Sequence, residues 1–133
     1  MSRLGLDASV VLVLVAAPAL GHEQVLSGSE WAAAGEEGAR VPFIRFGESG
    51  RVAGSGGCNR FRGSYQQSGD GLTFSPLAAT RMACPPEVMR RERAFFDMLS
   101  HVRGMRMGTG ELVLLDGEGR ERAVLTRRTG AAD

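Results

Sequence analysis

The segment Gly54–Tyr65 reads GSGGCNRFRGSY, and a second segment, Thr80–Cys84, reads TRMAC. Each contains one of the only two cysteines in the 133-residue chain. Glycine permits bulges and tight strand ends, and asparagine tolerates the left-handed backbone conformation better than most residues. The first segment therefore predicts a tight turn around Gly57 and Asn59 that leads into a strand.

Short apolar runs alternate with turn signals on both sides of this segment, which is typical of antiparallel strands. Residues 61–66 place Phe61, Gly63 and Tyr65 on one face and polar side chains on the other, as in a half-buried strand. The expected strands cover residues 41–46, 51–54, 61–66, 72–74, 111–115 and 122–126, with turns at 47–50, 68–71 and 116–119. The predicted core aromatics are Trp31, Phe61, Tyr65 and Phe74.

One helix is expected over about residues 86–103. Pro85 and Pro86 mark its start, because proline fixes φ and its missing N–H costs little in the first turn. Its apolar stripe consists of Val88, Phe95, Leu99 and Val102. Glu92 falls on the same stripe, and because a lone buried carboxylate is costly, we expect it at the edge of the stripe, paired with an arginine.

The N-terminus resembles a secretory signal over residues 1–21. Residues 8–20 form an uncharged run that would rise about 20 Å as a helix, less than the ~30 Å hydrocarbon core, so no permanent membrane span is expected. A retained N-terminal helix or strand is the alternative. A lipoprotein needs cysteine where this chain has His22, so no lipid anchor is expected. Residues 22–30 are small and polar and predict a flexible entry segment.

Composition excludes several function classes. The 16 basic residues are all arginine and are balanced by 15 acidic residues spread through the chain, so no basic stripe for nucleic acid is evident. No phosphate-binding glycine–lysine motif and no G-x-S-x-G motif occur. His22, His101 and the two cysteines lack metal-ligand spacing. We therefore expect no enzyme activity, cofactor or metal.

Cys58 and Cys84 are expected to form a disulfide, since a sole pair in an exported chain usually pairs with itself. A disulfide that closes the loop between these two positions would contribute about 3.5 kcal/mol to stability on the loop-entropy model. It would bring the two cysteine segments close to the helix. The polar residues expected to gather there are Gly57, Asn59, Arg60, Thr80, Arg81 and Glu92. They form either a structural network or a small anion-binding or partner-binding patch in which Arg60 and Arg81 are the donors.

The pattern G-C-N-x-F-x-G-x-Y followed by L-x-x-T-R-M-A-C resembles the META domain, the family that includes HslJ-like heat-shock proteins of the bacterial envelope. The resemblance places the domain at residues 31–128, followed by a tail at 129–133. It implies a mainly β (α+β) fold, a curved antiparallel sheet or partly closed small β-barrel with one packed helix. It also implies a non-catalytic periplasmic or secreted protein of the envelope stress response, with tolerance of novobiocin.

Two other functions stay open at this point. One is a carrier whose barrel interior holds a small apolar ligand, lined by Phe43, Phe61, Phe74 and Leu112. The other is an inhibitor or docking module that binds an envelope protein through an exposed edge or loop. The expected partner is thus an envelope protein or a small ligand, and the protein is expected to be a monomer.

Overall fold

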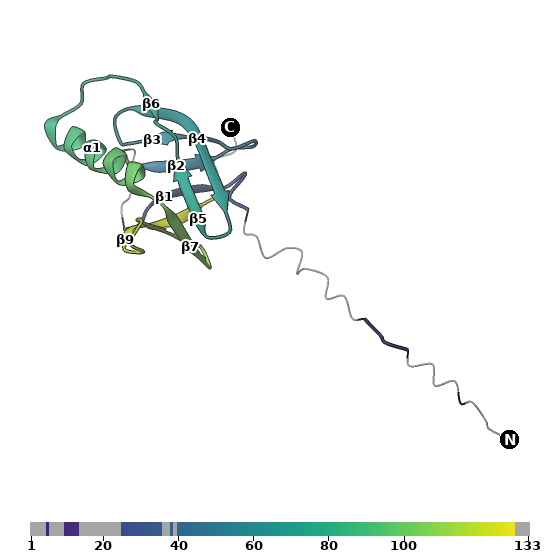
Figure 1. Cartoon of the computed structure of the whole chain (residues 1–133). Helices are drawn as coiled ribbons and strands as arrows, with labels where there is room; N and C mark the ends of the chain where they lie inside the picture. Colours follow the sequence, from purple (N-terminus) through teal and green to yellow (C-terminus); the bar gives the residue numbers. More distant parts are fainter. Residues whose placement is uncertain (1–4, 6–9, 14–24, 36–37, 39, 130–133) are drawn as a thin grey trace.

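The computed structural model describes residues 5, 10–13, 25–35, 38 and 40–129 (Figure 1). The predicted signal peptide falls mostly outside these residues, as do His22 and residues 130–133 of the predicted tail. The elements are β1 (Glu30–Ala33), β2 (Phe43–Phe46), β3 (Arg51–Ser55), β4 (Arg60–Ser68), β5 (Gly71–Phe74), β6 (Ala78–Ala79), α1 (Pro86–His101), β7 (Gly104–Gly108), β8 (Glu111–Leu115) and β9 (Glu121–Arg128).

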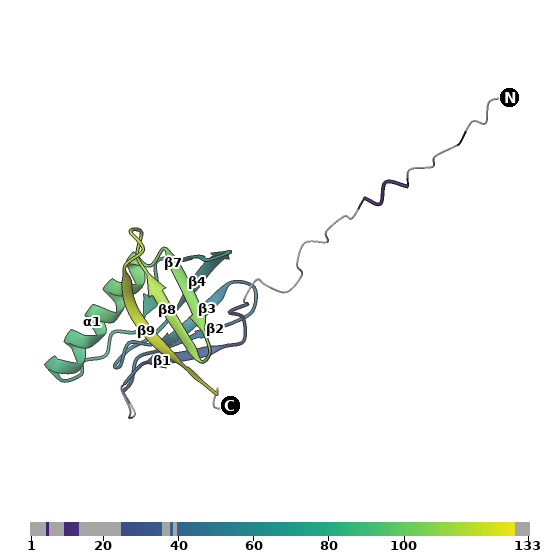
Figure 2. The same cartoon turned by 90° about the horizontal axis from the view of Figure 1, so that it is seen from below.

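The strands form one antiparallel sheet that closes on itself. Its order is β3-β2-β1-β9-β8-β7-β5-β4-β6, and β3 also pairs with β4, so eight strands form a ring to which β6 is added beside β4. The weakest seam joins β5 to β7, where Gly71 pairs with Gly104. The helix α1 lies along one side of this ring (Figures 1 and 2). The predicted mainly β fold with one packed helix is therefore confirmed.

The core lies inside the ring and beneath α1. The strands contribute Trp31, Ile44, Phe46, Val52, Phe61, Leu72, Leu112, Leu114 and Leu125, and the helix contributes Phe95, Met98 and Leu99. Tyr65 and Phe74 pack against this cluster, so the predicted core aromatics are in or against the core. Alternation along β4 buries Phe61 and exposes Arg62, as the period-two pattern predicts. The helix begins at Pro86, as expected, and ends at His101.

The entry segment differs from the expectation over its described part. Leu26 is fully buried, and the N–H of Gly28 donates to the carbonyl of Phe46 at 2.7 Å. The indole Nε1 of Trp31 donates to the Ser29 hydroxyl at 2.7 Å. The chain is therefore part of the packed domain from Leu26, because Leu26 fills core space that the strands alone leave open. The predicted domain start at residue 31 is too late.

The β8–β9 hairpin depends on Asp116, which is 9% exposed. Its Oδ1 accepts the N–H groups of Glu118 and Arg120, both at 2.9 Å, and its Oδ2 accepts Arg120 Nε at 3.2 Å. The pKa of this carboxyl lies below its ordinary value of 3.8, chiefly because the Arg120 N–H stabilises the charged form.

This lowered pKa predicts a pH-dependent stability. The ionised carboxylate is favoured by the fold, so its contribution is complete above pH 3.8 and is lost as the pH falls through the lower folded value. We expect the stability gap between the wild type and Asp116→Asn to narrow in acid. Urea unfolding at neutral pH and below pH 3.8 measures the gap. A gap that stays constant would contradict the assignment.

Candidate functional site

The glycines of the GSGGCN segment allow close packing between β3, β4 and α1. A Cβ at Gly54 would lie 2.7 Å from the Phe61 ring, and one at Gly56 would lie 2.6 Å from Cγ of Glu92. Gly57 has a φ of 116°, a conformation that side chains rarely adopt. These glycines therefore allow the helix to pack closely against the strands and the turn to adopt its shape. The turn leads from Ser55, at the end of β3, into β4.

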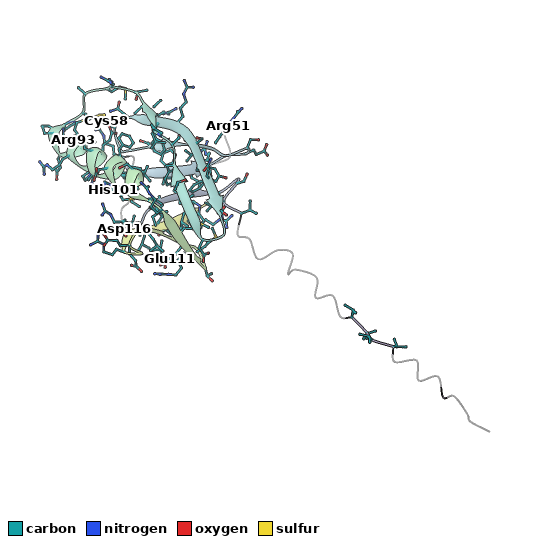
Figure 3. All side chains as sticks on the ribbon, in the orientation of Figure 1. Arg51, Cys58, Arg93, His101, Glu111 and Asp116 are labelled. Carbon is teal, nitrogen blue, oxygen red and sulfur yellow. A yellow bond between two sulfur atoms is a disulfide. The ribbon has the colours of Figure 1, made fainter. Side chains whose placement is uncertain are left out.

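The disulfide between Cys58 and Cys84 is present, as predicted, with the two Cα atoms 6.1 Å apart. Figure 3 shows Cys58 beside α1, nearer to Arg93 than to His101, the last residue of the helix. The bridge connects the turn between β3 and β4 to the loop that precedes Pro86. Two segments that are 26 residues apart in sequence are thereby joined at the start of the helix.

Glu92 is the buried centre of this region, at 3% exposure. Its Oε2 accepts the N–H groups of Cys58 at 2.8 Å and Asn59 at 2.5 Å. Its Oε1 accepts the side-chain amide of Asn59 at 2.6 Å. Successive backbone N–H groups in a turn form a concave site for an anion, and here the anion is the helix's own carboxylate.

Asn59 connects Glu92 to the TRMAC segment. Its Oδ1 accepts the Thr80 hydroxyl at 2.9 Å and the Met82 N–H at 2.6 Å. Its Nδ2 also donates to the Met82 carbonyl at 3.3 Å. The Thr80 hydroxyl oxygen in turn accepts the N–H of Arg60 at 3.2 Å. The side-chain polar groups of Asn59, Thr80 and Glu92 are thus used within one network.

The guanidinium groups of the two predicted arginine partners lie outside this network. The side chains of Arg60 and Arg81 are exposed, and every hydrogen-bond partner of the Glu92 carboxylate in the described part of the chain comes from Cys58 or Asn59. The expectation that an arginine pairs with Glu92 at the edge of the stripe is therefore wrong. Turn N–H groups carry partial positive charge and replace the guanidinium. Sequence alone offered no signal for this, nor for the role of the Met82 backbone.

The interior residues proposed for a carrier do not all face inward. Phe61 and Leu112 belong to the packed core, and Phe74 packs against it. Phe43 lies on the outer face, because side chains alternate along β2 and the inward positions belong to Ile44 and Phe46. The Arg128 guanidinium is 4.8 Å from the centre of the Phe43 ring. The expectation that Phe43 lines the interior is therefore wrong. Phe61 and Leu112 do face the interior, but there they are part of the packed core.

Among the described residues, no three or more His, Cys, Asp or Glu side chains gather in a way that could hold a metal ion. No helix in the described part of the chain has the length and apolar character that a membrane span requires.

A comparison with family models identifies the family of this chain. The family model of the META domain matches residues 23–129, which include both cysteine segments and the whole strand ring. The chain belongs to the META domain family. This assignment confirms the resemblance seen in the two cysteine motifs, and the matched range begins close to Leu26, the first buried residue of the described chain.

Solved structures of other proteins share the fold of this chain. The NMR structure of a protein from Burkholderia xenovorans is 26% identical over 79% of this chain and 85% of its own, with a TM-score of 0.63. A second NMR structure is 27% identical over 77% of this chain and 90% of its own, with a TM-score of 0.58. A DUF4847 family protein from Bacteroides vulgatus, 12% identical over 85% of this chain and 100% of its own, shares the fold with a TM-score of 0.59. The sequence comparison finds no similar curated protein.

Proposed function

We propose that this META domain is a non-catalytic protein of the bacterial envelope, exported to the periplasm or secreted, that contributes to tolerance of heat or novobiocin. The observation that carries the proposal is the use of the motif's polar groups. Glu92, Asn59 and Thr80 hydrogen-bond to one another and to the backbone of their own segments. Such a network holds a fold and leaves no motif carboxylate free to act as an acid or base.

The disulfide supports the proposed location. Disulfides persist in oxidising compartments such as the periplasm and are rare in the cytosol. The Cys58–Cys84 disulfide joins the two motif segments. A protein that folds in a reducing compartment would lack this covalent connection between them. The signal-like residues 1–21 and the family's HslJ-like members favour the same location.

Docking on a partner fits this fold better than carriage of a ligand in the interior. An apolar groove of about 370 Å³ lies between α1 and the segment that joins β5 to β6, lined in part by Phe74, Leu77 and Phe96. β6 is the last strand in the sheet order, so its outer edge has no partner strand among the described elements. A groove beside a free strand edge suits an extended apolar segment of an envelope protein.

A complementation experiment tests the proposal. In a strain that lacks the gene, we expect greater sensitivity to heat and novobiocin, which the full-length protein restores. A version without residues 2–21 is expected to fail, because it stays in the reducing cytoplasm. Cell survival and fractionation are the measurements. Restoration by the cytoplasmic version, or an unchanged survival of the deletion strain, would contradict the proposed function.

Two variants extend this experiment to mechanism. Glu92→Gln is expected to lower tolerance only as far as it lowers the folded population, since the carboxylate is structural. Ala79→Glu, on the exposed edge of β6, is expected to lower tolerance while the protein stays folded. Loss of tolerance in a fully folded Glu92→Gln protein would contradict the non-catalytic assignment.

A further inference from the structure

The outer face of β2, β3 and β4 gathers four arginines around one alanine. In the strand register Ala53 lies opposite Arg45 on one side and opposite Arg62 on the other. Arg51 precedes Ala53 by two positions on the same face, and Arg60 pairs with Ser55 two positions later. We call these four arginines with Ala53 the arginine face. Arg51, at one end of this face, lies on the side of the molecule away from Arg93 of α1 (Figure 3).

Most of this positive charge is not neutralised within the described residues. Arg51, Arg60 and Arg62 make no ion pair there, while Arg45 is held by the buried Glu30 at 2.8 Å. By contrast, Arg106 of β7 and two arginines of β9, Arg122 and Arg128, pair with acidic residues. In a chain of net charge +1, three uncompensated arginines on one face are a local concentration of charge.

The arginine face is also hollowed. A groove of about 600 Å³ is lined by Arg45, Arg51 and Arg62 with Ala53, and Pro76 and Ala78 form part of its wall. Two adjoining grooves contain Ala53 and Arg60. Ala53 has a small side chain, which leaves space between the arginines that line the groove. The volume lies within the range of small-ligand sites.

We propose that this groove binds a phosphate ester. Each guanidinium presents a planar fork of donors that matches phosphate and carboxylate oxygens. A single carboxylate carries one negative charge and two oxygens, which one arginine can satisfy in bidentate geometry. A phosphate monoester carries about two charges and three terminal oxygens at neutral pH, so it matches several arginines around one small residue. The apolar wall of Pro76 and Ala78 would contact the organic part of the ester.

This inference goes beyond the proposed function, because it concerns arginine side chains on the outer face of the sheet that take no part in the network of Glu92, Asn59 and Thr80. The test is a titration of the disulfide-linked, isotope-labelled protein followed by amide NMR signals. One arm adds glycerol 3-phosphate, and a second adds phosphatidylcholine vesicles that contain phosphatidic acid, whose headgroup is a phosphate monoester, with vesicles of phosphatidylcholine alone as their control. We expect saturable shifts or broadening confined to residues 51–55, 60–62 and 76–79, weakened by added salt.

Matched variants separate the groove from general charge attraction. The double variant Arg51→Gln with Arg62→Gln is expected to weaken binding about tenfold or more, since it removes two charged donors. The control Arg90→Gln with Arg93→Gln removes the same charge from the exposed face of α1 and is expected to bind as the wild type does. Melting temperatures confirm that both variants fold.

Each outcome decides the proposal or its ligand source. Binding of glycerol 3-phosphate without vesicle binding supports a soluble ester, and binding of both supports a headgroup as well as a soluble ester. Equal loss of affinity in the two double variants, shifts centred on α1, or the absence of binding in both arms would overturn the proposal. Because the measurement is made on purified protein, it does not depend on the survival phenotype.

Discussion

Replacing Glu92 by alanine is expected to lower the free energy of unfolding by about 3 kcal/mol, since it leaves two buried donors and one part-buried donor without their acceptor. These donors are the N–H groups of Cys58 and Asn59 and the side-chain amide of Asn59. An unsatisfied buried donor costs about 1–3 kcal/mol, and water entering the vacated space recovers part of the total. Urea unfolding of the oxidised protein measures the change.

Glu92→Gln and Arg93→Ala are the informative companions. Glutamine keeps one acceptor oxygen, but its NH2 group would face one of the donors that now point at Glu92. The Asn59 amide cannot flip to present its oxygen instead, because that oxygen already accepts the Thr80 hydroxyl and the Met82 N–H. We expect a loss of about 1–2 kcal/mol for glutamine and less than about 0.5 kcal/mol for the exposed Arg93→Ala. A Glu92→Ala loss no larger than that of Arg93→Ala would refute the structural role of the carboxylate.

Breaking the disulfide is expected to have a similarly large effect. Closing a loop of 26 residues contributes about 3.5 kcal/mol on the loop-entropy model, so the Cys58→Ser, Cys84→Ser double variant should unfold at clearly lower urea concentration. Reduction of the wild type should produce a comparable loss, while the double variant should not respond to reductant. Thiol titration of the unfolded, non-reduced wild type should find no free thiol. Equal stability of the reduced and oxidised wild type would contradict the prediction.

Glu92 and the disulfide are expected to be coupled rather than additive. Both hold the turn at Gly57–Asn59, from α1 in one case and from the TRMAC segment in the other. Once one of these two constraints is removed, the turn is more mobile and the other constraint stabilises it less. The combined variant should therefore lose less unfolding free energy than the sum of the two separate losses. A combination of the three variants in a double-mutant cycle measures this interaction.

Much of the strand pattern was predictable because it depends on local alternation. Phe61 and Arg62 take the faces that the period-two pattern assigns, and Pro86 begins the helix. β1 and β7 were missed for identifiable reasons. β1 contains Glu30, whose burial depends on Arg45 of β2 and Arg128 of β9. β7 reads GMRMG, with a glycine at each end and no β-branched residue, so it has little strand propensity of its own.

The motif region divides in the same way between local and long-range causes. The sequence identified Cys58, Cys84, Asn59 and Glu92 as residues of one region, and it placed Glu92 on the inner helical stripe. It assigned an arginine as the partner of Glu92, because opposite charge is the ordinary answer to a buried carboxylate. In the structure, backbone N–H groups bind the Glu92 carboxylate instead. Every residue except proline has such a group, so no sequence pattern indicates which ones will bind a buried carboxylate.

The sequence by itself determined the family, the helix and the faces of the most regular strands, because these depend on residue types at short spacing. It also determined the disulfide pair, because Cys58 and Cys84 are the only cysteines. Only the tertiary structure decided how the ring closes, what surrounds Glu92 and where the arginines gather. Arg45, Arg51, Arg60 and Arg62 look evenly mixed with other residues along the chain. Strand register places them around Ala53, and register is set by pairing between strands rather than by any one of them.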